Sequence, residues 1–427
     1  MKRAAAWTLA ALVLLVVVLT ALVGALNFRG EQPIPEATTH FRPTAEQVKR
    51  GEYLVRAGNC IACHTARGGA PYAGGVGVRT PFGTVYSSNI TPDAKTGIGR
   101  WSAAHFWRAL HNGRSRDGRL LYPAFPYTEY TLVTRADSDA MFAYLLSLPP
   151  VEQVRRPHEL RFPYDSQAAL AVWRALFFEP GVYVNDPAQP EQWNRGAYLV
   201  RGVGHCAACH GGRNAFGATT NRLELSGGVI PMQGWYAPSL SSSREAGVAD
   251  WDAQHVVQLL KTGVAPRGSV MGPMAEVVFR STQYLTDDDL RAMALFLKQL
   301  PETETARAAT TVLDGETRTR GGRVYEDHCA RCHGKQGEGT PGAYPALAKN
   351  RAVTMNSTAN VIRVVLSGGY LPATSANPRP YGMPPFAPLL DDAQVAAVLS
   401  YIRASWGNDA QPVLQREVMR YRTGAVQ

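Results

Sequence analysis

Six cysteines occur in three copies of one pattern, in which two cysteines separated by two residues are followed at once by a histidine. Two thiols at this spacing lie on one helical turn, where both can bond to the vinyl groups of a haem while the histidine reaches the iron. The pattern therefore predicts three covalently attached haem c groups. The copies are Cys60-Ile-Ala-Cys63-His64, Cys206-Ala-Ala-Cys209-His210 and Cys329-Ala-Arg-Cys332-His333.

Other kinds of cysteine chemistry explain the pattern less well. A zinc site needs Cys-x-x-Cys units in pairs, so three units leave one unmatched and the three histidines unexplained. A thioredoxin-like redox site expects a single such unit at the start of a helix. A disulfide framework expects a higher density than six cysteines in 427 residues.

A haem iron that transfers electrons usually takes a second axial ligand, and methionine raises its potential relative to a second histidine. Met274 follows His210 by 64 residues and Met383 follows His333 by 50 residues. Each is expected in a loop just before a helix, and both are predicted to ligate iron. Met271 is the main competitor of Met274, and the other methionines are expected to pack in the core.

The first copy departs from this arrangement. Phe125 stands 61 residues after His64, where a ligand is expected, and phenylalanine cannot bind iron. Met141 is expected in the core of a helix. His105 is a doubtful ligand because a matching histidine occurs in the second copy, which already has a methionine. His111 is better placed, although a solvated helical histidine is the favoured interpretation. The first haem is therefore five-coordinate, weakly ligated or bound by two histidines.

The helices that must position these residues repeat with the motifs. Closing helices are expected at 138–148, 286–300 and 391–404, each packed on the helix that opens its own repeat. Trp101 to His105 matches Trp251 to His255, and the third copy is expected to lack this element. The opening segments are Arg50-Gly51-Glu-Tyr53-Leu54-Val55-Arg56, Arg195-Gly196-Ala-Tyr198-Leu199-Val200-Arg201 and a looser Gly322-Arg-Val-Tyr325, and the closing helices carry Tyr144, Phe296 and Tyr401 at similar places.

An apolar run without charges extends from Ala4 to Leu26, 23 residues or about 34 Å of helix, which is enough to span a bilayer. Lys2 and Arg3 precede it and predict a cytoplasmic N-terminus, with the rest of the chain on the periplasmic side of the inner membrane. A cleaved signal peptide with a site at Val23-Gly24-Ala25 is the alternative to a retained anchor. Both export the chain.

The charge balance is basic, with 44 Lys and Arg against 34 Asp and Glu. This suits an anionic partner, haem propionates or an acidic membrane surface. No basic block is interleaved with aromatics, so a nucleic acid is not an expected partner. Candidates to pair with the propionates of the first haem, with a solvated basic surface as the alternative, are Arg100, Arg114, Arg116 and Arg119.

These observations predict a mainly α fold of three class-I-type cytochrome c domains in tandem after an N-terminal transmembrane helix. The expected ranges are 1–30 for the anchor and 40–160, 185–305 and 315–410 for the domains. The length of 427 residues agrees with several domains, because one hydrophobic core becomes inefficient at this size.

The ordered set of motifs from about Pro43 to Trp406 resembles the tri-haem cytochrome c subunits of bacterial membrane-bound dehydrogenases. The resemblance implies an electron-transfer subunit without catalytic activity of its own. It also implies a catalytic dehydrogenase partner, of aldehyde, alcohol or molybdenum-hydroxylase type, and ubiquinone or a downstream acceptor. The motifs that carry it, besides the haem sites, are Ser88-Asn89-Ile90-Thr91-Pro92-Asp93, Gly97-Ile98-Gly99-Arg100-Trp101, Tyr122-Pro-Ala-Phe-Pro-Tyr127 and Gly272-Pro-Met-Ala-Glu276.

Two other functions remain open at the level of sequence. A multihaem peroxidase or oxidase would use an open first haem, which Phe125 permits, but it would also need distal polar groups that no local pattern identifies. A freestanding electron shuttle fits poorly with an anchored chain of three domains. The partner's substrate, the haem potentials and the order of electron flow are not encoded in any motif.

Overall fold

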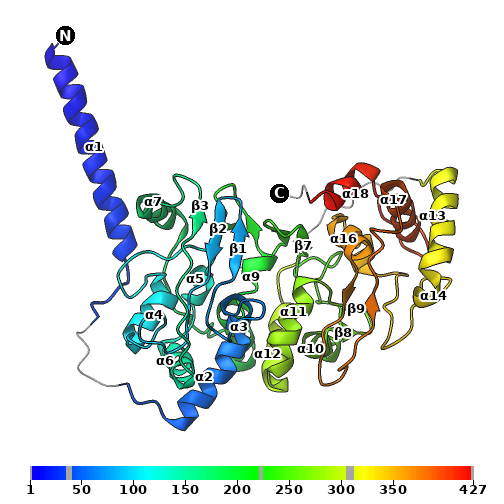
Figure 1. Cartoon of the computed structure of the whole chain (residues 1–427), viewed down its shortest axis with the longest axis horizontal. Coiled ribbons are helices and arrows are strands. Elements are labelled where there is room, and N and C mark those ends of the chain that lie inside the picture. Colours follow the sequence, from blue (N-terminus) through cyan, green and yellow to red (C-terminus); the bar gives the residue numbers. More distant parts are fainter. Residues whose placement is uncertain (1, 35–40, 221–224, 304–311, 425–427) are drawn as a thin grey trace. The chain divides into compact units, whose positions relative to one another are not determined.

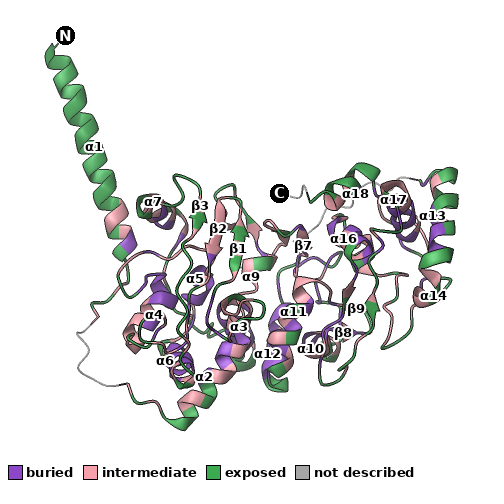
Figure 2. Ribbon diagram, viewed as in Figure 1, coloured by how far each residue is buried: buried purple, intermediate pink, exposed green. Residues whose placement is uncertain are grey.

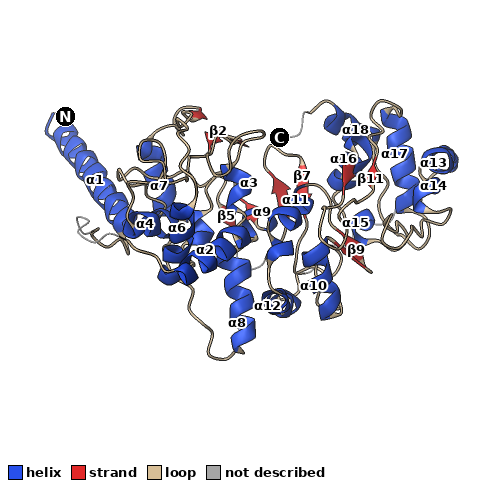
Figure 3. Cartoon of the chain, turned by 60° about the horizontal axis from the view of Figure 1, so that its bottom comes forward, coloured by secondary structure: helices blue, strands red, loops and turns tan. Residues whose placement is uncertain are grey.

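The computed structural model describes residues 2–34, 41–220, 225–303 and 312–424. Helices dominate, with short strands between them (Figures 1 and 3). The chain folds as two compact units, unit 1 with residues 1–55 and 63–184 and unit 2 with residues 56–62 and 185–427. The expected boundaries at residues 1, 40 and 305 lie outside the described residues.

Helix α1 (Lys2–Phe28) contains the apolar run and continues two residues beyond it. Within the described residues it is the one helix long and apolar enough to cross a membrane, and its most apolar stretch is not buried by the protein. Figure 2 shows it exposed along most of its length and covered only near its C-terminal end. Asn27, close to that end, is buried.

An opening helix, a middle helix and a closing helix follow one another three times, once around each cysteine motif. These three stretches are called the first, second and third repeats. The opening helices are α2 (Ala45–Ala57), α8 (Glu191–Tyr198) and α13 (Gly315–His328). The closing helices are α6 (Arg135–Ser147), α12 (Asp287–Lys298) and α17 (Asp392–Arg403).

Each opening helix packs on its own closing helix, as the sequence predicts, and the two cross at a glycine. A Cβ on this glycine would lie 1.9, 2.0 and 2.3 Å from a closing-helix carbonyl oxygen in the three repeats, so no side chain fits there. In the third repeat this residue is Gly321, one position before the looser segment that begins at Gly322. The crossing pairs are Gly51 with Ala140, Gly196 with Ala292 and Gly321 with Ala397, and the aromatic residues beside them are Tyr144, Phe296 and Tyr401.

The second opening helix has one more residue before its motif than the first. Gly51 precedes Cys60 by nine residues, whereas Gly196 precedes Cys206 by ten. The π-helical turn η1 (Leu199–Val203) takes up this extra residue, since a π turn holds one more residue than an α turn. The extra residue is therefore accommodated within the opening helix, between the glycine crossing and the cysteine motif.

A middle helix is present in all three repeats. The helices are α4 (Ala103–Asn112), α10 (Ala253–Thr262) and α16 (Ala359–Ser367), and each ends at a glycine with positive φ. The third repeat lacks the Trp and His that the first two share, as expected, but it keeps the middle helix itself. Its N-cap residue Thr358 makes no side-chain cap hydrogen bond, whereas Ser102 and Asp252 cap the other two helices.

Short antiparallel strands and short helices complete both units. Unit 1 has a three-stranded sheet of β1 (Gly77–Thr80), β2 (Gly83–Tyr86) and β3 (Glu159–Leu160). Unit 2 has the pairs β4 (Gly212–Arg213) with β5 (Thr219–Thr220), β6 (Gly228–Ile230) with β7 (Trp235–Ala237), β8 (Val264–Ala265) with β9 (Gly268–Ser269) and β10 (Gly369–Tyr370) with β11 (Gly382–Met383). The remaining helices are α3 (Cys60–His64), α5 (Tyr127–Tyr130), α7 (Gln167–Phe177), α9 (Ala207–His210), α11 (Pro273–Arg280), η2 (Thr282–Tyr284), α14 (Ala330–His333), α15 (Arg351–Thr354) and α18 (Gln415–Arg422).

The third repeat has a helix beyond the range expected from the sequence. Helix α18 packs on α16 and α17, and Val418 is fully buried in their shared core. Arg422 forms an ion pair with Asp392 at 2.6 Å. The compact region therefore extends past residue 410.

Candidate haem sites

Each cysteine motif forms a single helical turn directly after its opening helix. The backbone N–H of His210 donates to the carbonyl of Cys206 at 2.8 Å, and that of His333 donates to Cys329 at 2.9 Å. The two sulfurs of each motif are thus carried by one turn, as attachment to two vinyl groups requires. The six cysteines, all within the described ranges, form no disulfide bonds.

All three motif histidines place Nδ1 against a backbone carbonyl oxygen. The distances are 2.7 Å from His64 to Ser88, 2.7 Å from His210 to Pro238 and 3.0 Å from His333 to Pro345. A carbonyl only accepts, so Nδ1 must carry the proton and donate it. The Nε2 atom then keeps its lone pair, which is the form of imidazole that binds a metal.

The same surroundings keep these imidazoles neutral. Burial lowers the pKa of His64, His210 and His333, and the hydrogen bonds to the carbonyls only partly oppose this. A neutral ring with a fixed tautomer fits haem iron well. No group of three or more His, Cys, Asp or Glu side chains gathers as a metal site in the described part of the chain, so the zinc alternative gains no support.

The three carbonyl acceptors were missed by sequence reasoning, because a backbone acceptor has no side-chain signature. Aligning the repeats on these positions reveals a weak signal. Each acceptor is followed by a small or polar residue and then by Ile or Leu. The segments are Ser88-Asn89-Ile90, Pro238-Ser239-Leu240 and Pro345-Ala346-Leu347.

The predicted distal methionines lie between the middle and closing helices of their repeats. Met274 is in the first turn of α11, half-buried against Val270 and Val278. Met383 is in β11, half-buried against the core of the third repeat. Met274 thus lies in a helix and Met383 in a strand, not in the expected loops, and their role as iron ligands stays a prediction.

Met271 points to a different part of unit 2. A Cβ on Gly369 in β10 would lie 3.2 Å from the methyl carbon of Met271. Gly369 is paired with Met383 across the β10–β11 hairpin. Met271 therefore packs on the third repeat, while Met274 packs within the second, and this favours Met274 as the ligand of the second haem.

In the first repeat the place of the methionine is taken by an aromatic cluster. Phe125 is half-buried, with its ring centroid 5.5 Å from that of Tyr130 and 6.4 Å from that of Tyr127. Met141 is 2% exposed in α6, in the core as predicted. Phe125 has no lone pair for iron and Met141 packs in the core, so neither is a candidate distal ligand.

The two candidate histidines of the first repeat have structural contacts. His105 belongs to the capping box of α4, where its Nδ1 accepts from the backbone N–H of Ser102 at 3.2 Å. This tautomer carries its proton on Nε2, so it does not suit iron binding. The placement agrees with the doubt about His105.

The expectation that His111 is solvated is wrong, because it is buried and its ring stacks on Trp107 at 4.5 Å. Its Nδ1 donates to the carbonyl of Thr131 at 2.8 Å. At the matching position of the second repeat, Lys261 donates to the carbonyl of Leu285 at 2.6 Å. Both side chains therefore tie the end of the middle helix to the segment that enters the closing helix.

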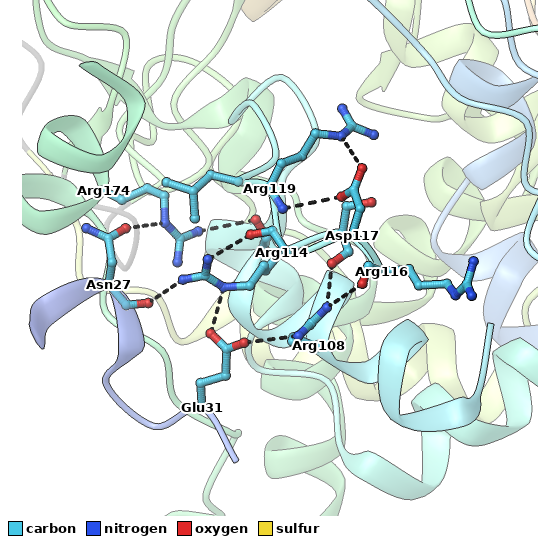
Figure 4. A network of polar contacts seen from close by, with 12 residues as sticks. Asn27, Glu31, Arg108, Arg114, Arg116, Asp117, Arg119 and Arg174 are labelled. Atoms are coloured by element: carbon cyan, nitrogen blue, oxygen red, sulfur yellow. Dashed lines mark hydrogen bonds and ion pairs between the residues drawn. The ribbon is translucent and has the colours of Figure 1, made fainter. Parts of the chain in front are cut away.

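The propionate role predicted for Arg114 is contradicted by its contacts (Figure 4). Its Nε donates to Glu31 at 2.8 Å, and its two other nitrogens donate to the carbonyls of Gly118 and Asn27. Arg119 pairs with Asp117 at 3.0 Å. The role stays a prediction for Arg100 and Arg116, which are exposed, and for Arg119, which is partly exposed.

A sequence model of the cytochrome c family matches residues 48–149 and 319–406, which hold the first and third motifs. The chain is 38% identical over 397 residues to the cytochrome c subunit of alcohol dehydrogenase (quinone) from Gluconobacter oxydans, covering 88% of this chain and 82% of that protein. It is also 38% identical over 382 residues to the gluconate 2-dehydrogenase cytochrome c subunit of Pantoea cypripedii, covering 85% and 86%. The chain belongs to the family of dehydrogenase cytochrome c subunits.

Members of this family are electron-transfer components of dehydrogenase complexes and not their catalytic subunits. One of the subunits of nicotinate dehydrogenase from Pseudomonas putida is 42% identical over 374 residues, which is 86% of this chain but 31% of that protein. The chain therefore spans less than a third of that relative. As a dehydrogenase cytochrome c subunit it carries covalent haem c, and its mainly helical fold and N-terminal apolar helix agree with the sequence expectation.

Proposed function

We propose that this chain is a three-haem electron relay that accepts electrons from a periplasmic dehydrogenase and passes them to ubiquinone or the respiratory chain. The observation that carries the proposal is the repeated histidine geometry. Three motif turns each present a neutral imidazole whose Nδ1 donates to a carbonyl. The second motif, outside the ranges matched by the family model, has the same contact as the other two.

Different residues would hold different parts of each haem. Two cysteines fix it covalently, the histidine binds one face of the iron, and Met274 or Met383 binds the other face in the second and third repeats. Bound haem c supplies one-electron chemistry at iron. The protein sets the potentials through axial ligands and burial, and the repeated helices keep the three sites in one chain.

The partner is proposed from the relatives. Alcohol, gluconate and fructose dehydrogenases have cytochrome subunits that resemble this chain over most of its length. The nicotinate dehydrogenase relative adds a further kind of partner, so the proposed dehydrogenase is of alcohol, aldehyde or molybdenum-hydroxylase type. The substrate itself would be bound by that partner.

The membrane location rests on α1. We infer that α1 is retained and spans the inner membrane, with Lys2 and Arg3 in the cytoplasm and both units in the periplasm. The helix runs unbroken through Val23-Gly24-Ala25, the candidate cleavage site. Asn27, two residues further on, donates to the carbonyl of Val23 at 2.8 Å, so the residues on both sides of this site share one hydrogen-bonded helix end.

Haem counting tests the relay. The intact mass of the purified chain should show three haem additions, and the pyridine haemochrome assay should agree. Replacing both Cys206 and Cys209 by alanine should remove one addition. A wild-type chain with two haems, unchanged by this replacement, would overturn the proposal for the second motif.

A peroxidase with an open first haem is the second candidate, and Phe125 is the observation in its favour. Low-temperature EPR of the oxidised protein and CO binding to the reduced protein separate the two functions. Three low-spin haems without CO binding would exclude the peroxidase. A high-spin signal, CO binding and sustained peroxide turnover that depend on His64 would establish it instead.

A further inference from the structure

Helix α7 (Gln167–Phe177) buries a charged side chain against unit 1. Arg174, which is 3% exposed, donates from Nε to Asn27 Oδ1 at 2.9 Å. Gln167, at the exposed start of the helix, accepts from the backbone N–H of Leu120 at 2.7 Å. The inner face of α7 therefore holds this guanidinium beside Leu170, which is 5% exposed.

The outer face of α7 is apolar. Ala168, Val172 and Leu176 follow one another at intervals of four residues and form one exposed stripe. Val172 is 47% exposed and Leu176 is 68% exposed. A continuous apolar stripe on a short exposed helix is unfavourable in water, so the stripe calls for an apolar partner.

Helix α7 lies beside the end of α1, where α1 meets the folded part of unit 1 (Figure 1). The side-chain amide of Asn27 donates to the carbonyl of Ala171 at 2.8 Å. The guanidinium of Arg29 donates to the carbonyl of Phe178 at 3.1 Å. The apolar stripe is thus held next to a helix whose own apolar surface needs lipid.

A buried ionic network makes this junction stiff (Figure 4). Glu31 bridges Arg114 at 2.8 Å and Arg108 at 3.4 Å, and these three side chains are 8 to 15% exposed. Arg114 also donates to the backbone carbonyl of Asn27 at 3.1 Å. Such a network needs every partner in place. The end of α1 is therefore part of the fold of unit 1, and its direction relative to α7 is fixed.

We propose that α7 lies in the outer leaflet of the bilayer, at the boundary between head groups and acyl chains, alongside the point where α1 emerges. The occupant of its apolar stripe is lipid. Lipid is the expected occupant because the stripe continues the apolar surface of α1 at a fixed junction. This inference rests on the proposed membrane-spanning role of α1 and adds a second membrane contact, which holds the first haem domain against the surface.

Photo-crosslinking in liposomes of phosphatidylethanolamine and phosphatidylglycerol tests the inference on the full-length holoprotein. A benzophenone amino acid is introduced at position 172 or 176, with position 14 in α1 as the positive control. Position 389 is the matched negative control, because Leu389 is 67% exposed in unit 2 and Leu176 is 68% exposed. Lipid adducts are expected at 14, 172 and 176 and not at 389.

The possible outcomes distinguish a failure of the proposed α7 placement from a failure of the proposed α1 anchor. Adducts at 14 but not at 172 and 176 overturn the placement of α7 and leave the anchor standing. No adduct at 14 means that the anchor itself fails. Protein adducts at 172 and 176 in native membranes would assign the stripe to a partner protein and also overturn the proposal.

A charge substitution gives an independent measurement. The double variant Val172→Glu, Leu176→Glu should keep its haem spectrum, because both side chains point outward, and α1 should keep it in the membrane. Hydrogen exchange of α7 in liposomes should rise about tenfold or more relative to wild type, and Leu389→Glu should leave it unchanged. Equal protection in the double variant and wild type would contradict the proposal.

Discussion

Phe125 is the residue that most distinguishes the three haem sites. Its repeat counterpart is Met274, and both lie between the middle and closing helices of their repeats. Phenylalanine fills the space without a lone pair for iron. Of the nearby histidines, His105 caps α4 and carries its proton on Nε2, whereas His111 donates from Nδ1 to Thr131, as the motif histidines do to their carbonyls. A second histidine ligand to the first haem therefore stays a hypothesis that rests on His111.

The substitution Phe125→Met should convert the first site into one like the second. We expect CO binding by the reduced protein to fall from about one per chain to none, and the high-spin EPR signal of the oxidised protein to disappear, because sulfur occupies the open position. Phe125→Leu is the control and should change neither signal. If wild type already shows three low-spin haems, another residue ligates the first iron.

At the residue scale, the placement of the motif residues could be predicted from the sequence, because each motif is local. The cysteines, their histidines and the core position of Met141 follow from type and spacing. The burial of His111 does not, because it depends on Trp107 and on a carbonyl twenty residues away. The inward role of Arg114 also depends on distant residues, since Glu31 lies 83 positions away in the sequence.

At the scale of elements, the crossing of opening and closing helices is the feature shared by all repeats. The first two repeats add an ion pair at the crossing, Arg50 with Asp137 at 2.6 Å and Arg195 with Asp289 at 2.7 Å. In the third repeat the arginine before the glycine, Arg320, pairs instead with Glu316 on its own helix. The close glycine contact is therefore kept where the ion pair is not.

The substitution Gly321→Ala should destabilise the third repeat by about 1–3 kcal/mol, because the new Cβ would overlap the carbonyl of Ala397. Gly322→Ala is a matched control on the same helix. A Cβ there meets only the ring of Tyr401 at 3.4 Å, so this change should be neutral or stabilise the helix by up to about 1 kcal/mol. Urea unfolding followed by circular dichroism measures both, and equal effects would contradict the crossing geometry.

The second and third repeats are joined within unit 2 by a carboxylate that should respond to acid. Burial raises the pKa of Asp250, but hydrogen bonds from Arg351 and Arg267 outweigh this and hold the pKa at about 2. Because the folded pKa is depressed, the contribution of Asp250 to stability is present above its unfolded pKa near 4. It is lost as the pH falls through about 2.

The variant Asp250→Asn should therefore melt about 1–4 °C below wild type at pH 6. The difference should shrink as the pH falls from about 4 towards 2, because wild type then loses the same charge. Asp288→Asn, which removes an exposed pair with Arg291 inside α12, is the control. A difference that is constant from pH 6 to pH 2.5 would show that the carboxylate charge does not join the repeats.

For the whole molecule, the sequence predicts the anchor and the order of the repeats because both depend on residues that are neighbours in the sequence. The anchor is an apolar run, and the repeats are marked by recurring motifs. It could not predict how the anchor meets unit 1. Asn27 contacts Arg174, which is 147 positions away, and Glu31 contacts Arg108, which is 77 positions away. A buried polar residue at the end of an apolar helix is the one local sign of such a junction.

Glu31→Gln tests whether this junction orients unit 1 on the membrane. Two buried arginines would lose their carboxylate, so the free energy of unfolding of unit 1 should fall by about 3–5 kcal/mol, as measured by thermal denaturation in detergent. Hydrogen exchange at 108–120 should rise, while α1 keeps the chain in the membrane.

Glu179→Gln is the control for this junction, because Glu179 is 82% exposed and lies 3.7 Å from Arg29. It should cost less than about 1 kcal/mol. If Glu31→Gln melts like wild type, the ionic network does not hold the anchor to unit 1. The first haem domain would then be connected to α1 by a flexible segment. Its contact with the bilayer would depend on the apolar stripe of α7 alone.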